Sequence, residues 1–179
     1  MDWGLMKSNH LAGTPRARNK DPRRRVTLTN SVFYFALCIS VIVTGRGYAT
    51  VITSGDVQPG PPGVQSDPWN VGLVNVGALG VGSVTIENGG RVNGSVAILG
   101  YTSGAVGTLL ISGPGSTWDN SGTFWIGDYG TGNVTITSGG TISTGANMYV
   151  GIHAPGNTVT IEGASGGSDA TLAVGGTSI

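Results

Sequence analysis

Hydrophobic positions in this chain recur at a fixed interval of 25 residues. Each recurrence is a short alternating stretch: an aliphatic residue, usually a threonine, then an isoleucine, followed by a glycine-rich corner. The four isoleucines are Ile86, Ile111, Ile136 and Ile161. Alternation with a period of two predicts a β-strand with one buried face, and a repeat of about 20–50 residues is typical of a solenoid. The pattern therefore predicts a solenoid with one Val-Thr-Ile strand in each coil.

The alternation also predicts which side chains point inward, because successive residues of a strand face opposite sides. We expect the first and third positions of each Val-Thr-Ile strand to fill a dry core. These inward positions are Val84, Ile86, Leu109, Ile111, Val134, Ile136, Val159 and Ile161. The middle positions form an outward row of Thr85, Leu110, Thr135 and Thr160.

A second strand in each unit ends in an aliphatic residue followed by glycine. We expect five such strands, which end at Gly77, Gly100, Gly127, Gly151 and Gly175. Their inward positions include Ala97, Leu99, Phe124, Ile126, Met148, Val150, Leu172 and Val174, and their outward positions are Asn75, Ile98, Trp125, Tyr149 and Ala173. A weaker third strand around Val92, Trp118 and Ile142 completes the unit, and glycines occupy corners that need a positive φ.

Three strands and three turns in about 25 residues match one coil of a parallel β-helix, whose coils stack about 4.8 Å apart. The sequence predicts an all-β fold over residues 71–179: a right-handed parallel β-helix (solenoid) of about four to five coils. No capping pattern follows Val174, and the next rung is not built. We therefore expect a truncated or remnant gene product, since an exposed last rung is a sheet edge prone to association.

The first 49 residues predict a signal peptide. Residues 1–31 are polar and basic, residues 32–43 form an apolar run, and Gly47-Tyr48-Ala49 is a small-x-small end with cleavage expected before Thr50. The basic n-region is unusually long and resembles the extended signal peptides of some autotransporters. A membrane anchor is the alternative, but spanning a bilayer needs about 20 apolar residues, more than this run holds.

Residues 50–70 are rich in proline and glycine. Proline removes backbone donors and blocks regular pairing, so we expect a leader that covers or abuts the first coil. Trp69 near its end either plugs the core or lies on the surface.

The charged residues also divide the chain between residues 49 and 50. Residues 1–49 hold eight of the nine basic residues and two acids, whereas residues 50–179 hold one base, Arg91, and seven acids. This acidic later part lacks the basic footprint of nucleic-acid binding. Its lack of cysteine excludes a disulfide framework and cysteine-based zinc binding. Cysteine-free composition suits a protein exported into an oxidising space.

Two successive units, residues 113–127 and 130–140, carry a recognisable pattern. It reads Gly-Ser-Thr-Trp, then aliphatic-Gly, then Gly-x-Gly-x-aliphatic-x-Ile with a Gly-Gly corner. This pattern resembles the repeat shared by bacterial type V autotransporter passengers and PEP-CTERM-sorted extracellular proteins, over roughly residues 69–179. The first coil departs from it, with Gly90-Arg91-Val92 in place of the Gly-Ser-Thr-Trp element. The resemblance implies a secreted or surface-displayed β-helix.

Few residues offer chemistry. Asp119 and Asp128 lie in one repeat and are either turn residues that bond their own backbone, which we favour, or a carboxylate pair for glycan cleavage. His153 lies in a lengthened turn without the partner His or Cys that zinc binding needs, so we expect a surface residue. Trp125 and Tyr149 occupy equivalent outward positions on adjacent rungs, and form either a structural aromatic ladder or a platform for sugar rings or a protein.

Together these patterns predict a non-catalytic, exported β-helix segment of an autotransporter-like protein, with a structural or adhesive role. We expect it to be secreted or displayed on the surface of a Gram-negative bacterium, and to meet the membrane only through its transient signal peptide. Its candidate partners are an extracellular glycan or a surface protein, and we expect no catalytic residue, metal or cofactor. The alternatives are a glycan-binding module that uses Trp125 and Tyr149, or a polysaccharide-acting β-helix enzyme.

Overall fold

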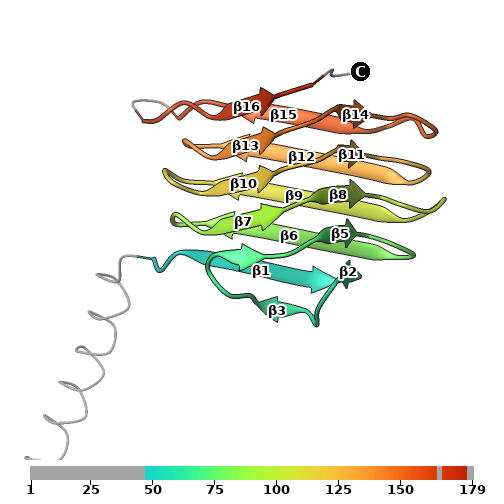
Figure 1. Ribbon diagram of the computed structural model, residues 1–179, viewed down its shortest axis with the longest axis horizontal. Coiled ribbons are helices and arrows are strands. Elements are labelled where there is room, and N and C mark those ends of the chain that lie inside the picture. Colours follow the sequence, from blue (N-terminus) through green and yellow to red (C-terminus); the bar gives the residue numbers. More distant parts are fainter. Residues whose placement is uncertain (1–46, 165–166, 177–179) are drawn as a thin grey trace, which may run out of the picture. The chain divides into compact units, whose positions relative to one another are not determined.

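The computed structural model describes residues 47–164 and 167–176, which form an all-β parallel β-solenoid of about four turns (Figure 1). This confirms the solenoid with its repeat of about 25 residues. All but three residues of the predicted signal peptide lie outside the described residues. The described strands form three sheets that run along the stack of coils.

Each sheet takes one strand from every coil. The first sheet holds β15 (Thr158–Glu162), β12 (Thr131–Thr137), β9 (Val106–Ser112), β6 (Val81–Glu87), β1 (Thr50–Gly55) and β3 (Gly63–Val64), in that order. The second holds β14 (Met148–Val150), β11 (Phe124–Ile126), β8 (Val96–Leu99), β5 (Leu73–Val76) and β2 (Val57–Gln58). The third holds β16 (Thr171–Val174), β13 (Thr141–Thr144), β10 (Thr117–Asn120), β7 (Arg91–Gly94) and β4 (Trp69–Asn70).

The Val-Thr-Ile strands stack in parallel and in the predicted register. Ile86 pairs with Ile111, Ile111 with Ile136, and Ile136 with Ile161. The outward residues Thr85, Leu110, Thr135 and Thr160 stack in the same way. Because neither this register nor the alternation slips between coils, each inward position meets the equivalent residue of the next coil.

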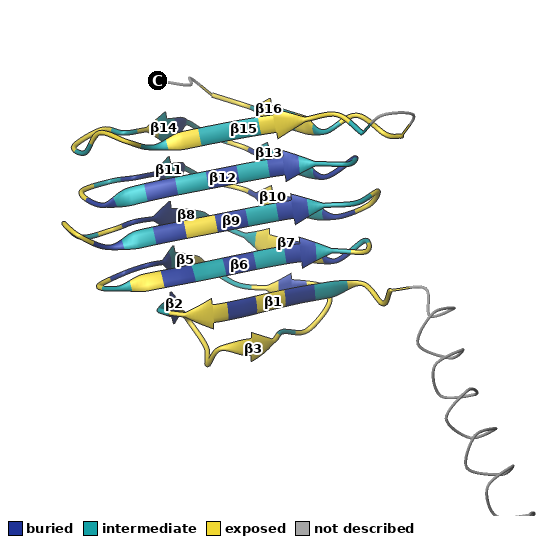
Figure 2. Ribbon diagram, turned by 180° about the vertical axis from the view of Figure 1, so that it is seen from behind, coloured by how far each residue is buried: buried dark blue, intermediate teal, exposed yellow. Residues whose placement is uncertain are grey.

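The core is a continuous column of aliphatic and aromatic side chains. Buried residues alternate with partly exposed ones along β6, β9 and β12 (Figure 2). Trp118 and Phe124 are its largest fully buried side chains, and their rings meet edge to face at a centroid distance of 5.5 Å. Trp69 is 8% exposed and belongs to this core, so it fills the first coil instead of lying on the surface.

Residues 50–70 contain strands, where the sequence predicted blocked pairing. β1 pairs antiparallel with β6 over six residues, and β2 pairs antiparallel with β5. The expectation failed because the prolines of this segment all lie between strands, where no ladder hydrogen bond is needed. Val51 of β1 is fully buried, so this reversed strand covers the first coil.

The predicted fifth aliphatic-Gly strand is wrong. β16 contains Leu172 and Val174 but pairs with β13 of the third sheet, where Leu172 lies opposite Ile142. Eight residues separate β15 from β16 along the chain, whereas three separate β12 from β13. The longer separation places β16 where the repeat predicts the next strand of the second sheet.

Two predicted inward positions of the last coil are exposed. Val150 is 37% exposed and Ile161 is 48% exposed, whereas Ile136 in the preceding coil is fully buried. Figure 2 shows the change from buried inner strands to the exposed surface of β15 and β16. Alternation fixes the face of a residue, but a core position is buried only where coils cover it on both sides.

Candidate functional site

Trp125 and Tyr149 are neighbours on the outer face of the second sheet, as predicted. They pair in register between β11 and β14, and their rings stack at a centroid distance of 6.4 Å and an interplanar angle of 25°. The Tyr149 hydroxyl accepts a hydrogen bond of 2.8 Å from Asn147 Nδ2, which fixes the ring. Both side chains are partly exposed.

The same outward row contains Ile98, which pairs in register with Trp125 and is only 5% exposed. An outward aliphatic that is nearly inaccessible shows that the row is packed. The Trp125 indole nitrogen is itself buried and has no hydrogen-bond partner among the described residues. Trp125 and Tyr149 are therefore packed against their neighbours in this row, and only part of each ring is exposed.

Asp119 does not lie in a turn, and this part of the sequence-based interpretation is wrong. It lies in β10, and its carboxylate accepts a hydrogen bond of 2.6 Å from Ser143 Oγ on the next coil. One coil before Asp119 in the same outward row, Asn93 Nδ2 donates to Asn70 Oδ1 at 2.7 Å. The outward face of the third sheet thus carries a polar ladder, a row of polar side chains in which two pairs bond between adjacent coils.

This polar ladder borders a surface depression of about 600 Å³. Its walls come from β7, β10 and β13 and from the bends that follow them. Side chains that line it include Asn93, Ser95, Asp119, Asn120, Ser121 and Ser143. Its size lies within the range of about 300–1,000 Å³ that is usual for small-molecule sites.

Asp128 bonds a side chain of the next coil instead of its own backbone. Its Oδ1 lies 2.8 Å from His153 Nδ1, and the His153 backbone N–H donates to the Asp128 carbonyl at 3.1 Å. The His153 ring stacks on Tyr129 at a centroid distance of 4.3 Å and an interplanar angle of 4°. His153 is a surface residue, as expected, with 46% of its side chain exposed.

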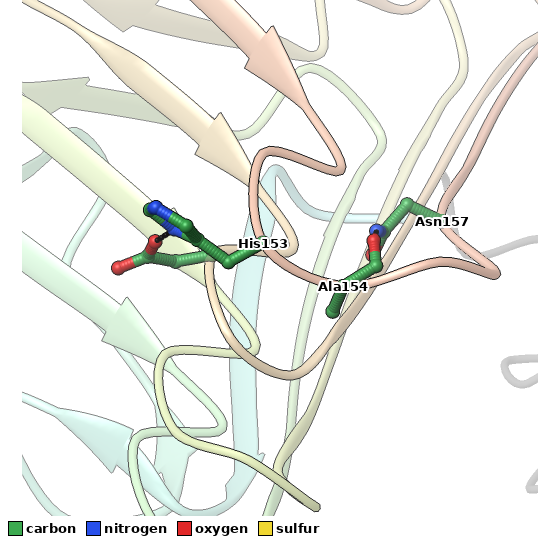
Figure 3. A network of polar contacts seen from close by, with 4 residues as sticks. His153, Ala154 and Asn157 are labelled. Atoms are coloured by element: carbon green, nitrogen blue, oxygen red, sulfur yellow. Dashed lines mark hydrogen bonds and ion pairs between the residues drawn. The ribbon is translucent and has the colours of Figure 1, made fainter.

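Figure 3 shows His153, Ala154 and Asn157 along one turn of the last coil. Asn157 immediately precedes β15, whose first residue Thr158 pairs with Asn133 of β12. Its Nδ2 donates to the Ala154 carbonyl at 2.6 Å, and its Oδ1 accepts from the Gly132 N–H at 2.6 Å. This asparagine therefore ties the turn that carries His153 to the coil below.

The sequence missed the cluster of Asp128, Tyr129 and His153. The available signal was the interval of 25 residues between Asp128 and His153, which places them at equivalent points of successive turns. Asp119 and Asp128 have separate partners. Asp119 bonds Ser143 on the third sheet, and Asp128, in the turn after β11, bonds His153.

Asp56 attaches the segment that covers the first coil (residues 50–70, the covering segment) to the turn before β6. Asp56 Oδ2 accepts hydrogen bonds from the backbone N–H groups of Leu79 at 2.6 Å and Gly80 at 2.8 Å. These two donors stabilise the ionised form and hold the pKa of Asp56 below its ordinary value. The role of this residue is structural, because it bonds the turn that precedes β6.

Within residues 47–164 and 167–176, no group of three or more His, Cys, Asp or Glu residues could hold a metal ion. No helix in that part of the chain is long and apolar enough to cross a membrane. Comparison of the chain with protein-family models, with curated proteins and with solved structures gives no match. The fold therefore defines its class: the chain is a parallel β-solenoid protein with a repeat of about 25 residues.

Proposed function

We propose that this chain is a non-catalytic scaffold segment of an exported, autotransporter-like surface protein. The observation that carries the proposal is the unbroken register of the first sheet, in which the rows of Ile86 and Thr85 continue through every coil. A stack of this kind presents outward side chains at regular spacing on a stiff support. Its exposed ladders serve contact with an extracellular glycan or a surface protein.

The start of the fold supports the export part of the proposal. Gly47, Tyr48 and Ala49 are exposed and lie outside regular secondary structure, and β1 begins at Thr50. A signal peptidase that cleaves before Thr50 would meet an accessible segment and release the solenoid with its first strand intact. The mature protein would then be acidic, because eight of the nine basic residues precede Thr50.

The adhesive part of the proposal concerns Trp125 and Tyr149. Their stacked rings are partly exposed on a rigid sheet, and aromatic side chains in such positions contribute much of the energy of many interfaces. A glycan-binding module that uses this pair is the second candidate, because both side chains are partly exposed. Replacing both residues by serine is expected to abolish adhesion while the far-UV circular dichroism spectrum stays unchanged.

Expression of the full chain with a C-terminal epitope tag in a Gram-negative host tests the proposal. We expect the tagged protein outside the cytosol, with Thr50 as its N-terminal residue by sequencing. Ala49→Leu is the matched variant, since a bulky residue before the cleavage point blocks processing. An unprocessed chain that remains in the cytosol would contradict export.

The non-catalytic character needs its own assay, against the polysaccharide-acting enzyme. The purified protein is incubated with acidic polysaccharides, and newly formed reducing ends and unsaturated products are measured. We expect no turnover above that of a heat-denatured control. Turnover that Asp119→Asn abolishes would show an enzyme and overturn the scaffold proposal.

A further inference from the structure

The last rung of the solenoid consists of β14, β15 and β16. Each is the end strand of its sheet in the part of the chain that the structure describes. Their inward side chains pack on the core from one side only: Val159, Leu172 and Val174 are partly buried, and Val150 and Ile161 are 37% and 48% exposed. A strand edge bordered by apolar side chains pairs readily with another strand.

The first end of the solenoid shows which kind of strand covers such an edge. There β1 pairs antiparallel with β6, so that Val51 lies opposite Ile86 and Thr53 opposite Val84. Val51 is fully buried and Thr53 is 2% exposed. A Val-Thr-Ile strand therefore accepts an antiparallel neighbour when inward positions meet inward positions.

β15 of a second copy has the alternation that β15 needs. In an antiparallel pair centred on Thr160, each Val159 lies opposite Ile161 of the other copy, and Thr160 lies opposite itself. Inward side chains thus meet inward side chains, as in the pair of β1 with β6. Glu162 lies opposite Thr158 in this register, so the two carboxylates do not face each other across the pair.

The same two-fold rotation exchanges the second and third sheets. β14 and β16 lie on the two walls of the coil that adjoin β15, one on each side of it (Figure 1). β14 of one copy would then run antiparallel to β16 of the other, with Met148 opposite Val174 and Val150 opposite Leu172. All four are inward positions that continue the columns of their own sheets.

The rise of the chain along the stack fits this rotation as well. In a solenoid each successive strand lies a step further along the axis, so β15 lies midway between β14 and β16. A two-fold axis centred on β15 brings the far strand of one copy to the near strand of the other. All three strand pairs then reach the usual spacing of about 4.8 Å together.

We propose that two copies of this chain associate tail to tail about a two-fold axis at Thr160, with β15 paired with β15 and β14 with β16. The contact continues the coil-to-coil packing of the core, and a surface that complements itself closes as a dimer. The paired strands have only three to five residues, so we expect a dissociation constant of about 10 µM or weaker. Dilute protein is therefore monomeric, with an open last rung.

Analytical ultracentrifugation of the full chain from about 1 µM to 1 mM tests the association. We expect a reversible equilibrium between monomer and dimer. Ile161→Glu should weaken the dimer by about tenfold or more, because its carboxylate would be buried against Val159 of the second copy. Leu73→Glu is the matched control: Leu73 is also 48% exposed but lies in β5, and its variant should associate as the wild type does.

Cysteine cross-linking tests the two-fold axis, with Cys38→Ser as the background and copper phenanthroline as the oxidant. Two copies of Thr160→Cys should form a disulfide, because opposed residues of an antiparallel pair have Cα atoms about 4.5–5.5 Å apart. Thr135→Cys is the control from the same outward row. Its two copies would lie three strand spacings apart, about 14 Å, which is too far for a disulfide.

Several results would overturn the proposal. These are a monomer at every concentration, a dimer that Ile161→Glu leaves intact, and equal cross-linking of the two cysteine variants. Growth into longer polymers would also contradict it, since that requires head-to-tail contact. A monomer whose β15 amides are protected from exchange would show that another segment of the same chain covers β15. The dimer does not depend on export or on the scaffold role, so either proposal can fail alone.

Discussion

At the scale of single residues, glycines close the coils. Gly77, Gly100, Gly127 and Gly151 end the second-sheet strands, and all four have φ between 64° and 74°. A side chain in this left-handed region is strained whatever space surrounds it. At Gly100 the space is also absent, because an added Cβ would overlap the Thr131 carbonyl.

Gly100→Ala and Gly104→Ala separate these two effects. Both residues have a positive φ, but a Cβ on Gly104 would have no heavy atom within 4 Å. We expect Gly104→Ala to lower the free energy of unfolding by about 1 kcal/mol, the cost of the backbone conformation alone. Gly100→Ala should cost at least twice as much, measured by urea unfolding. Equal costs would show that close packing of the corner is unimportant.

Asp56 gives the protein a predictable dependence on pH. Its folded-state pKa lies below the ordinary value, since the N–H groups of Leu79 and Gly80 favour the carboxylate. Its contribution to stability is therefore complete above about pH 4, the range of an unfolded carboxyl group. The contribution is lost as the pH falls through the folded-state pKa.

Asp56→Asn should therefore destabilise the protein at pH 6 and have a smaller effect at pH 3. The measurement is the urea midpoint of wild type and variant at both values. An unchanged difference between the two proteins at pH 3 and pH 6 would show that the ionised form of Asp56 is not what fastens the covering segment.

At the scale of elements, burial depends on pairing on both sides. β12 lies between β9 and β15, whereas β15 is the last strand of the described part of its sheet. Ile136 of β12 is fully buried, and its register partner Ile161 of β15 is 48% exposed. The same residue type at the same repeat position thus has two environments.

Alanine substitution compares these environments directly. Ile136→Ala should lower the free energy of unfolding by about 2–5 kcal/mol, because it leaves a cavity in the core. Ile161→Ala should cost about 1 kcal/mol or less, since much of the side chain already meets water. Thermal and urea unfolding measure both values. Similar losses would mean that another surface covers β15 in solution.

At the scale of the whole molecule, the two ends of the solenoid differ. The antiparallel strand β1 covers the first coil and buries Val51 completely. At the other end of the described residues, β15 and β16 contain no fully buried residue. Stability should therefore decrease along the stack toward the last coil.

Native-state hydrogen exchange should reveal this gradient. We expect the hydrogen-bonded amides of β9 and β12 to exchange only through global unfolding. Those of β15 should exchange at least about tenfold faster, equivalent to about 1.4 kcal/mol less protection. The amides of β6 serve as the internal control, because β1 pairs with them. Uniform protection from β6 to β15 would indicate a single cooperative unit without a weak end.

The candidate sites were predictable only where they follow the repeat. The stacking of Trp125 on Tyr149 was foreseen because both hold the same outward position in adjacent coils. The contact between Asp128 and His153 follows the same interval of 25 residues, but lies in turns, whose shape alternation does not describe. The depression on the third sheet had no signal, since a hollow in the surface depends on how side chains of successive coils pack.

The sequence alone determined the solenoid, the stacking of Ile86, Ile111, Ile136 and Ile161, and the glycine corners. These properties follow from local rules: alternation assigns the faces of a strand, and only glycine adopts a positive φ without strain. The tertiary structure decided the reversed direction of β1, the sheet to which β16 belongs and the partners of Asp119 and Asp128. These depend on turn lengths and on contacts between coils, and a repeat fixes such contacts only where its spacing is kept.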